Sequence, residues 1–116
     1  MILVVRSFSK ALASFDPGIK SELITLISRH TRGLSKNFIL LKEDGNLLIY
    51  KGYLNGKRVR VVVAKTKKGT YVPLEIFKKE SRGGYNIRDD YYSPGPIERM
   101  EREVEGDLYE TWELEY

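Results

Sequence analysis

The 116-residue sequence contains no cysteine and a single histidine, His30. The lack of cysteine excludes a disulfide framework and a zinc ribbon, and one imidazole cannot build a histidine-based metal site. No stretch approaches the ~20 apolar residues that a transmembrane helix needs, and residues 1–6 lack the basic flank and long apolar run of a signal peptide. These absences lead us to expect a cytoplasmic protein without a metal, a cofactor or a membrane contact.

Basic and acidic residues are unevenly divided along the chain, although the net charge of the whole is +4. Residues 1–85 hold 17 Lys and Arg against 6 Asp and Glu, a net of +11, whereas residues 86–116 hold 3 against 10, a net of −7. A positive charge of this size attracts polyanions, but lysines scattered over a surface also serve solubility alone. The placement of the basic residues therefore has to decide between these two interpretations.

The apolar pattern predicts one domain of the α+β class. Residues 2–5 read as a first strand, and apolar residues at helical spacing predict helices over residues 8–15 and 19–32, with Asp16 capping the second. The period then changes to two, which predicts strands over residues 37–42, 47–54, 57–66 and 70–77. We expect the N-terminal strand and the helical hairpin to pack on one face of an antiparallel sheet of four to five strands.

Proline, histidine and tryptophan residues and the C-terminal segment give further expectations. Pro73, inside the last predicted strand, indicates an edge strand or a bulge. Residues 93–96 read as a break before a short charged helix over residues 97–104, and residues 107–116 form an acidic, aromatic tail. We expect His30 to compensate the dipole at the end of the second helix, and Trp112 to pack or dimerise rather than bind a ligand.

The dipeptide Asn55-Gly56 is a strong signal for a two-residue hairpin turn. Such a turn pairs Leu54 with Lys57, and the same register sets Lys51 opposite Arg60. The sheet face that carries this pair holds the polar side chains of the hairpin, which are Lys51, Tyr53, Arg58 and Arg60. A like-charge pair destabilises a sheet by up to ~1 kcal/mol. Folding gives no reason for it, whereas an anionic ligand does.

Further cations and tyrosines surround this predicted patch. If the turn at residues 67–69 is a three-residue loop that pairs Thr66 with Thr70, Lys78 lies beside Arg58 and extends the patch. Cations contact phosphates and aromatic faces stack bases at ~1–3 kcal/mol each, a combination typical of RNA binding. The expected RNA-binding side chains are Tyr53, Lys57, Arg58, Lys67, Lys68 and Arg82. The alternative is an exposed sheet face whose cations are merely solvated.

These features resemble the RelE/ParE superfamily of toxins from prokaryotic toxin–antitoxin pairs. The resemblance covers residues 1–88 and rests on the first strand with its helical hairpin over residues 8–32, and on the arginine-bearing hairpin of residues 47–62. It also rests on the strand end Ile76-Phe77-Lys78-Lys79 and on Tyr85-Asn86-Ile87 behind it. The resemblance implies a RelE-like core followed by an acidic, aromatic extension over residues 89–116.

The resemblance also implies an activity, because nuclease members of the family cleave messenger RNA, often on the ribosome, without a metal. It implies catalytic roles for Arg60 at the scissile phosphate, Lys51 at the attacking ribose hydroxyl, Lys78 or Lys79 at the leaving oxygen, and Tyr85 at the substrate, with Arg58 in support. Fixed cations stabilise the developing phosphate charge. Crowding by arginines favours the neutral form of a lysine, which suits Lys51 to act as the base.

Two alternatives to a nuclease remain at this point. One is a non-catalytic toxin of the gyrase-inhibiting branch, and the other is a plain RNA- or DNA-binding module that uses the same cations to hold phosphates. The expected partners are mRNA, which can be ribosome-bound, and an acidic antitoxin. The acidic extension can fold back over the basic face, pack as an extra helix or mediate a homodimer.

Overall fold

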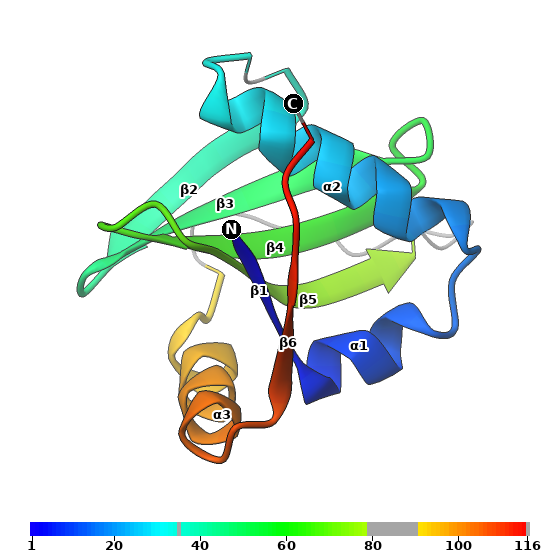
Figure 1. Ribbon diagram of the computed structural model, residues 1–116. Coiled ribbons are helices and arrows are strands. Elements are labelled where there is room, and N and C mark those ends of the chain that lie inside the picture. Colours follow the sequence, from blue (N-terminus) through cyan, green and yellow to red (C-terminus); the bar gives the residue numbers. More distant parts are fainter. Residues whose placement is uncertain (35, 79–90, 116) are drawn as a thin grey trace.

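A computed structural model describes residues 1–34, 36–78 and 91–115 of the chain (Figure 1). In chain order the elements are β1 (Ile2–Val5), α1 (Arg6–Leu12), α2 (Gly18–Thr31), β2 (Phe38–Asp44), β3 (Leu47–Leu54), β4 (Val59–Thr66), β5 (Tyr71–Lys78), α3 (Pro94–Glu105) and β6 (Tyr109–Trp112). The strands form one sheet in the order β2-β3-β4-β5-β1-β6. The fold is therefore α+β, as the sequence predicts.

The sheet differs from the expected one in size and in direction. It has six strands in the described residues, and it is mixed, because β1 runs parallel to β5. The sixth strand is β6, whose Trp112 pairs with Ile2 and whose Tyr109 pairs with Val5 in an antiparallel ladder. This segment was expected to be an acidic tail, but Trp112 is buried and the strand extends the sheet.

Helices cover both faces of the sheet (Figure 1). On one face, Leu26 of α2 packs against Gly52 of β3. On the other, Arg99 of α3 lies 3.7 Å from Glu75 of β5. The apolar side chains of β1, β4 and β5 are buried between these layers, and Val61, Val62 and Val63 are fully enclosed. The expectation of helices on one face holds for α2, while α3 adds a second layer.

The helix ends depart from the sequence analysis at two places. Asp16 does not cap α2 with its side chain, because Pro17 already has helical backbone angles and Ile19 N–H donates to the backbone oxygen of Asp16. Residues 93–96 are not a break: α3 begins at Pro94, since proline is tolerated in the first turn of a helix. Gly33, with a φ of +79°, ends the helical region after α2 as expected.

The C-terminal elements are tied to the N-terminal part of the chain. The carboxylate of Glu103 in α3 accepts hydrogen bonds from the backbone N–H and the hydroxyl of Ser7. The carboxylate of Glu115 accepts a hydrogen bond from Thr25 of α2 at 2.9 Å, and Lys20 lies over the ring of Trp112. Within the described ranges, no helix has the length and apolar character that a membrane crossing demands.

Candidate nucleic-acid interface

The turn between β3 and β4 has four residues rather than the expected two. Leu54 pairs with Val59, and Asn55, Gly56 and Lys57 all have positive φ angles, of 49°, 60° and 71°. The change moves the register by two residues, so the faces of the hairpin are as expected but the partners are not. Lys51 consequently lies opposite Val62, and Arg60 lies opposite Tyr53.

Four side chains at this end of the hairpin form what we call the Tyr53 cluster: Lys51, Tyr53, Lys57 and Arg60. The Nζ atoms of Lys51 and Lys57 lie 5.8 and 6.0 Å from the centroid of the Tyr53 ring, and Cζ of Arg60 lies 5.8 Å from it. Three cations thus surround one aromatic ring, at the distance where cation–π attraction operates. The prediction that Lys51 and Arg60 lie close together on one face is confirmed, because both contact the Tyr53 ring. The prediction that they are direct cross-strand partners is wrong.

A bulge in β5 decides which residues join this face. The turn at residues 67–69 pairs Thr66 with Thr70 as expected, since Thr66 N–H donates to the Thr70 oxygen at 2.9 Å. The register then shifts by one residue, because Val63 pairs with Pro73 but Val62 pairs with Glu75. Leu74 is the extra residue, and every side chain after it changes face.

The bulge brings Phe77 opposite Arg60 and removes Lys78 from that face. Arg60 is therefore flanked by two aromatic residues, Tyr53 on β3 and Phe77 on β5. Phe77 was not among the predicted site residues, although the bulge that Pro73 indicates places it there. Tyr53, Arg60 and Phe77 form a row across three neighbouring strands, which is a geometry that can stack bases beside a phosphate contact.

Lys78 and Arg58 lie together, but not with the Tyr53 cluster. Lys78 donates to the backbone oxygen of Ser14 at 3.2 Å and lies 4.9 Å from the centroid of Phe15. Lys78 and Arg58 both line a small cavity of about 220 Å³, and Asp16 lines it as well. Lys78 pairs with Val59 rather than with Arg58, so the expected register is wrong, although both cations line this cavity. Their expected placement on the face of Arg60 is also wrong, because of the turn and the bulge.

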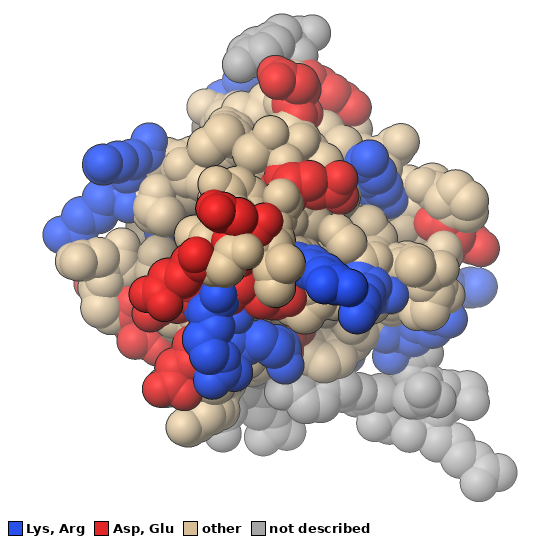
Figure 2. All heavy atoms as spheres, turned by 60° about the horizontal axis from the view of Figure 1, so that its bottom comes forward, with Lys and Arg blue, Asp and Glu red and all other residues tan. Residues whose placement is uncertain are grey.

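The other predicted site residues are not brought to the cluster. Lys67 and Lys68 lie in the turn after Thr66, at the opposite end of β4 from Arg60. The remaining three residues, Lys79, Arg82 and Tyr85, lie outside the described residues. Figure 2 shows the side of the molecule that carries α3, where acidic and basic side chains are interleaved, so the surplus of basic residues does not make this side uniformly positive.

The single histidine belongs to a buried aromatic group on the α2 face of the sheet. The His30 ring packs 4.8 Å from Phe38 and 4.7 Å from Tyr50, and its Nδ1 lies 2.7 Å from the Tyr71 hydroxyl. Burial, with a smaller contribution from Lys65, lowers the pKa of His30, and burial raises the pKa of Tyr71 to about 12. His30 is thus half-buried against this aromatic group at the end of α2, and its role extends beyond the expected dipole compensation.

The described residues contain no group of three or more His, Asp or Glu side chains that could hold a metal ion. The chemistry available at the Tyr53 cluster is that of cations, a phenol and an aromatic face. Comparison with known proteins adds no assignment: no family model matches the chain, and neither the curated proteins nor the solved structures searched gave a significant match.

Proposed function

We propose that the protein binds single-stranded RNA through the Tyr53 cluster. The observation that carries the proposal is the convergence of three cations on one tyrosine ring, with Lys51, Lys57 and Arg60 each about 6 Å from its centroid. Ammonium and guanidinium groups hold phosphates, while the rings of Tyr53 and Phe77 offer faces on which bases stack. Single-stranded RNA presents both groups at once, because its bases are not already paired.

RNA cleavage is a second candidate, and the shared face of Lys51 and Arg60 favours it. In this reaction the 2′-oxygen attacks the neighbouring phosphorus, a base accepts the 2′-OH proton, and the bond to the 5′-oxygen breaks as that oxygen gains a proton. Lys51 is suited to the base and Arg60 to the charge on the phosphate. Because Lys78 lies on the other face of the sheet, Lys57 takes its place as the cation for the leaving oxygen.

With this activity the protein would be a RelE/ParE-like toxin. The order of one strand, two helices and a meander supports this assignment, as does the arginine on the central strand β4. An acidic antitoxin would act by covering the Tyr53 cluster and competing with RNA for its cations.

The test measures binding and cleavage on the same variants. A fluorescently labelled single-stranded RNA is titrated with the wild type, with Lys51→Ala, and with Lys67→Ala as a control that removes one positive charge from the far end of β4. Loss of a phosphate contact by Lys51→Ala lowers the slope of log affinity against log salt by about 0.7, and the control leaves it unchanged. Equal slopes for all three proteins would contradict binding at the cluster.

The cleavage candidate is judged from rates and from product ends. If Lys51 is the base, Lys51→Ala lowers the cleavage rate by ~10²–10⁴ with a modest loss of affinity. The products then carry a 2′,3′-cyclic phosphate and a 5′-hydroxyl. Recovery of a 5′-phosphate and a 3′-hydroxyl would rule out attack by the ribose hydroxyl. If the protein binds RNA without cleaving it, the nuclease candidate fails and RNA binding alone remains.

A further inference from the structure

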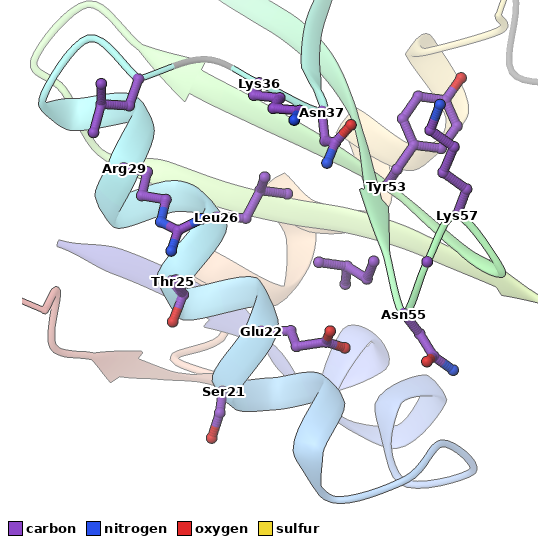
Figure 3. A pocket seen from close by; sticks show the side chains of 13 residues that line it. Ser21, Glu22, Thr25, Leu26, Arg29, Lys36, Asn37, Tyr53, Asn55 and Lys57 are labelled. Atoms are coloured by element: carbon purple, nitrogen blue, oxygen red, sulfur yellow. The ribbon is translucent and has the colours of Figure 1, made fainter.

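A groove of about 1020 Å³ lies between α2 and the end of the β3–β4 hairpin (Figure 3). Glu22, Leu26 and Arg29 form its wall on α2, while Lys36 and Asn37 lie at its upper end and Asn55 lies across from the helix. Tyr53 and Lys57 also line the groove. These two residues belong to the Tyr53 cluster as well, so the groove and the cluster meet at the sheet edge.

We propose that this groove is a second RNA subsite, which holds the nucleotides of a strand that continues past the Tyr53 cluster. The inference rests on the proposed RNA binding and extends it to residues that the sequence analysis did not select. An RNA strand can pass from the cluster to the groove at this edge of the sheet, because the β2–β3 ladder ends there. Its last pair is Phe38 with Gly52, and the N–H of Tyr53 then donates to the backbone oxygen of Asn37. Beyond that point β3 has no described neighbouring strand on this side.

The charges of the groove suit a phosphate backbone. Arg29, Lys36 and Lys57 are exposed, and none of them forms an ion pair with a carboxylate of the described residues. Arg29 lies on α2 and Lys36 at the start of the strand region, so cations stand at separate positions along the groove, as successive phosphates require. The acidic groups are Glu22 and, through its hydrogen bond to Thr25, Glu115 at the rim.

The polar groups between these cations favour RNA over an acidic peptide. Glu22 projects from α2 toward the hairpin end, where Asn55 also lies. A carboxylate in this position repels the acidic side chains of a peptide but accepts hydrogen bonds from the amino group of a base such as cytosine. The side-chain amides of Asn37 and Asn55 supply both donors and acceptors to base edges or to ribose hydroxyls.

The experiment separates the groove from the cluster by the length of the RNA. Labelled oligocytidylates of about three and about twelve nucleotides are titrated, because the shorter can occupy the cluster alone and the longer can reach both subsites. The groove variant is Arg29→Gln with Lys36→Gln. Its matched control, Lys67→Gln with Lys68→Gln, removes the same charge from the turn between β4 and β5.

The groove variant is expected to bind the longer RNA about tenfold more weakly than the wild type at ~0.1 M salt, with a salt slope lower by about 1.4. It should bind the shorter RNA as the wild type does, and the control should resemble the wild type with both lengths. Tyr53→Ala should weaken both lengths, because it alters the cluster itself.

Each other outcome overturns a different statement. If the wild type binds RNA and the groove variant binds the longer oligonucleotide equally well, the groove is not an RNA subsite and the proposed function stands. If an oligoglutamate peptide binds the wild type but not the groove variant and leaves RNA affinity unchanged, the groove takes a protein partner instead. If the wild type binds neither RNA length, both the proposed function and this inference fail.

Discussion

Arg60 and Tyr53 are direct cross-strand partners, and the guanidinium carbon lies 5.8 Å from the centre of the phenol ring. The pair holds a guanidinium group and an aromatic ring side by side on neighbouring central strands of the sheet. Arg60 is paired on both sides, with Tyr53 on β3 and Phe77 on β5, while Tyr53 pairs with β4 and donates its N–H to the Asn37 oxygen. This support fixes the distance between the guanidinium and the ring more firmly than a loop would.

The aromatic ring of Tyr53 should matter for RNA affinity independently of its hydroxyl group. Tyr53→Leu removes the stacking face and is expected to weaken RNA binding by ~1–3 kcal/mol, while Tyr53→Phe retains the face and most of the affinity. Titration of a labelled single-stranded RNA with each purified variant measures the difference. If the Leu and Phe variants bind equally well, the ring does not stack on the RNA.

Gly52 is required by the close approach of α2 to the sheet. A Cβ atom at this position would lie 2.7 Å from Leu26 Cδ2, 3.0 Å from Val61 Cγ1 and 3.2 Å from Phe38. Gly52→Ala is therefore expected to lower the free energy of unfolding by ~1–3 kcal/mol, because a packed interior does not accommodate an added methyl group.

Gly18→Ala is the matched control for Gly52→Ala. Nothing lies within 4 Å of the added Cβ atom at position 18, and the backbone there needs no positive φ. In urea unfolding, the midpoint of Gly52→Ala should lie below that of the wild type, and the midpoint of Gly18→Ala should not. Similar midpoints for the two variants would mean that α2 can move away from the sheet at little cost.

Glu103 stabilises α1 from a distance in sequence. The helix has no side-chain cap of its own at Val5, and the Glu103 carboxylate accepts a 2.7 Å hydrogen bond from the Ser7 N–H in its first turn. Glu103→Ala leaves this donor without its partner and is expected to cost ~1–3 kcal/mol of stability. Thermal unfolding compared with Glu101→Ala, an exposed site on the same helix, measures the effect; equal melting temperatures would contradict it.

The stability of the protein should fall as the solution becomes mildly acidic. Burial, and secondarily Lys65, lowers the pKa of His30 in the folded protein. The unfolded chain therefore binds a proton first, as the pH falls below about 6.5, and the free energy of unfolding decreases from there toward the lower folded pKa. Above that window His30 is neutral in both states and contributes no pH dependence.

Denaturant unfolding between pH 7.5 and 5.5 tests the role of His30 in this dependence (range set by its ordinary pKa of about 6.5). His30→Gln should flatten the curve in this range, because the chain has no other histidine. An NMR titration of the His30 ring in the intact protein gives an independent readout. A midpoint at or above the ordinary value would show that burial does not control this group.

The sequence predicted the bounds of β3, Leu47–Leu54, and buried side chains alternate with more exposed ones from Tyr50 to Leu54. It also predicted the faces of the paired residues of the β3–β4 hairpin, since the error in the turn was two residues and a shift of two preserves the face of each paired residue. Arg58 is the exception, because it lies in the turn. The turn itself could not be predicted from Asn55-Gly56. Lys57 also adopts a left-handed backbone, with a φ of 71°, which a side chain of this kind rarely does.

The bulge in β5 had the opposite effect. Pro73 correctly indicated an irregular strand, but its one-residue shift exchanged Lys78 for Phe77 on the face of Arg60. A pattern of single residues does not fix such a shift, because it depends on how Val62 and Val63 fit their neighbours. The strand β6 was missed for a different reason: four residues, of which only Trp112 is buried, are too few to give a strand signal before they pair with β1.

The position of β1 also affects the order in which the protein can be assembled during translation. β1 is the first strand to be synthesised, yet both of its neighbours, β5 and β6, are made much later. Pairings between such distant segments form slowly, because a long loop must close before any contact compensates for it. The hairpin that bears Tyr53 joins strands adjacent in sequence and can pair early, whereas the sheet is complete only when β6 pairs with β1.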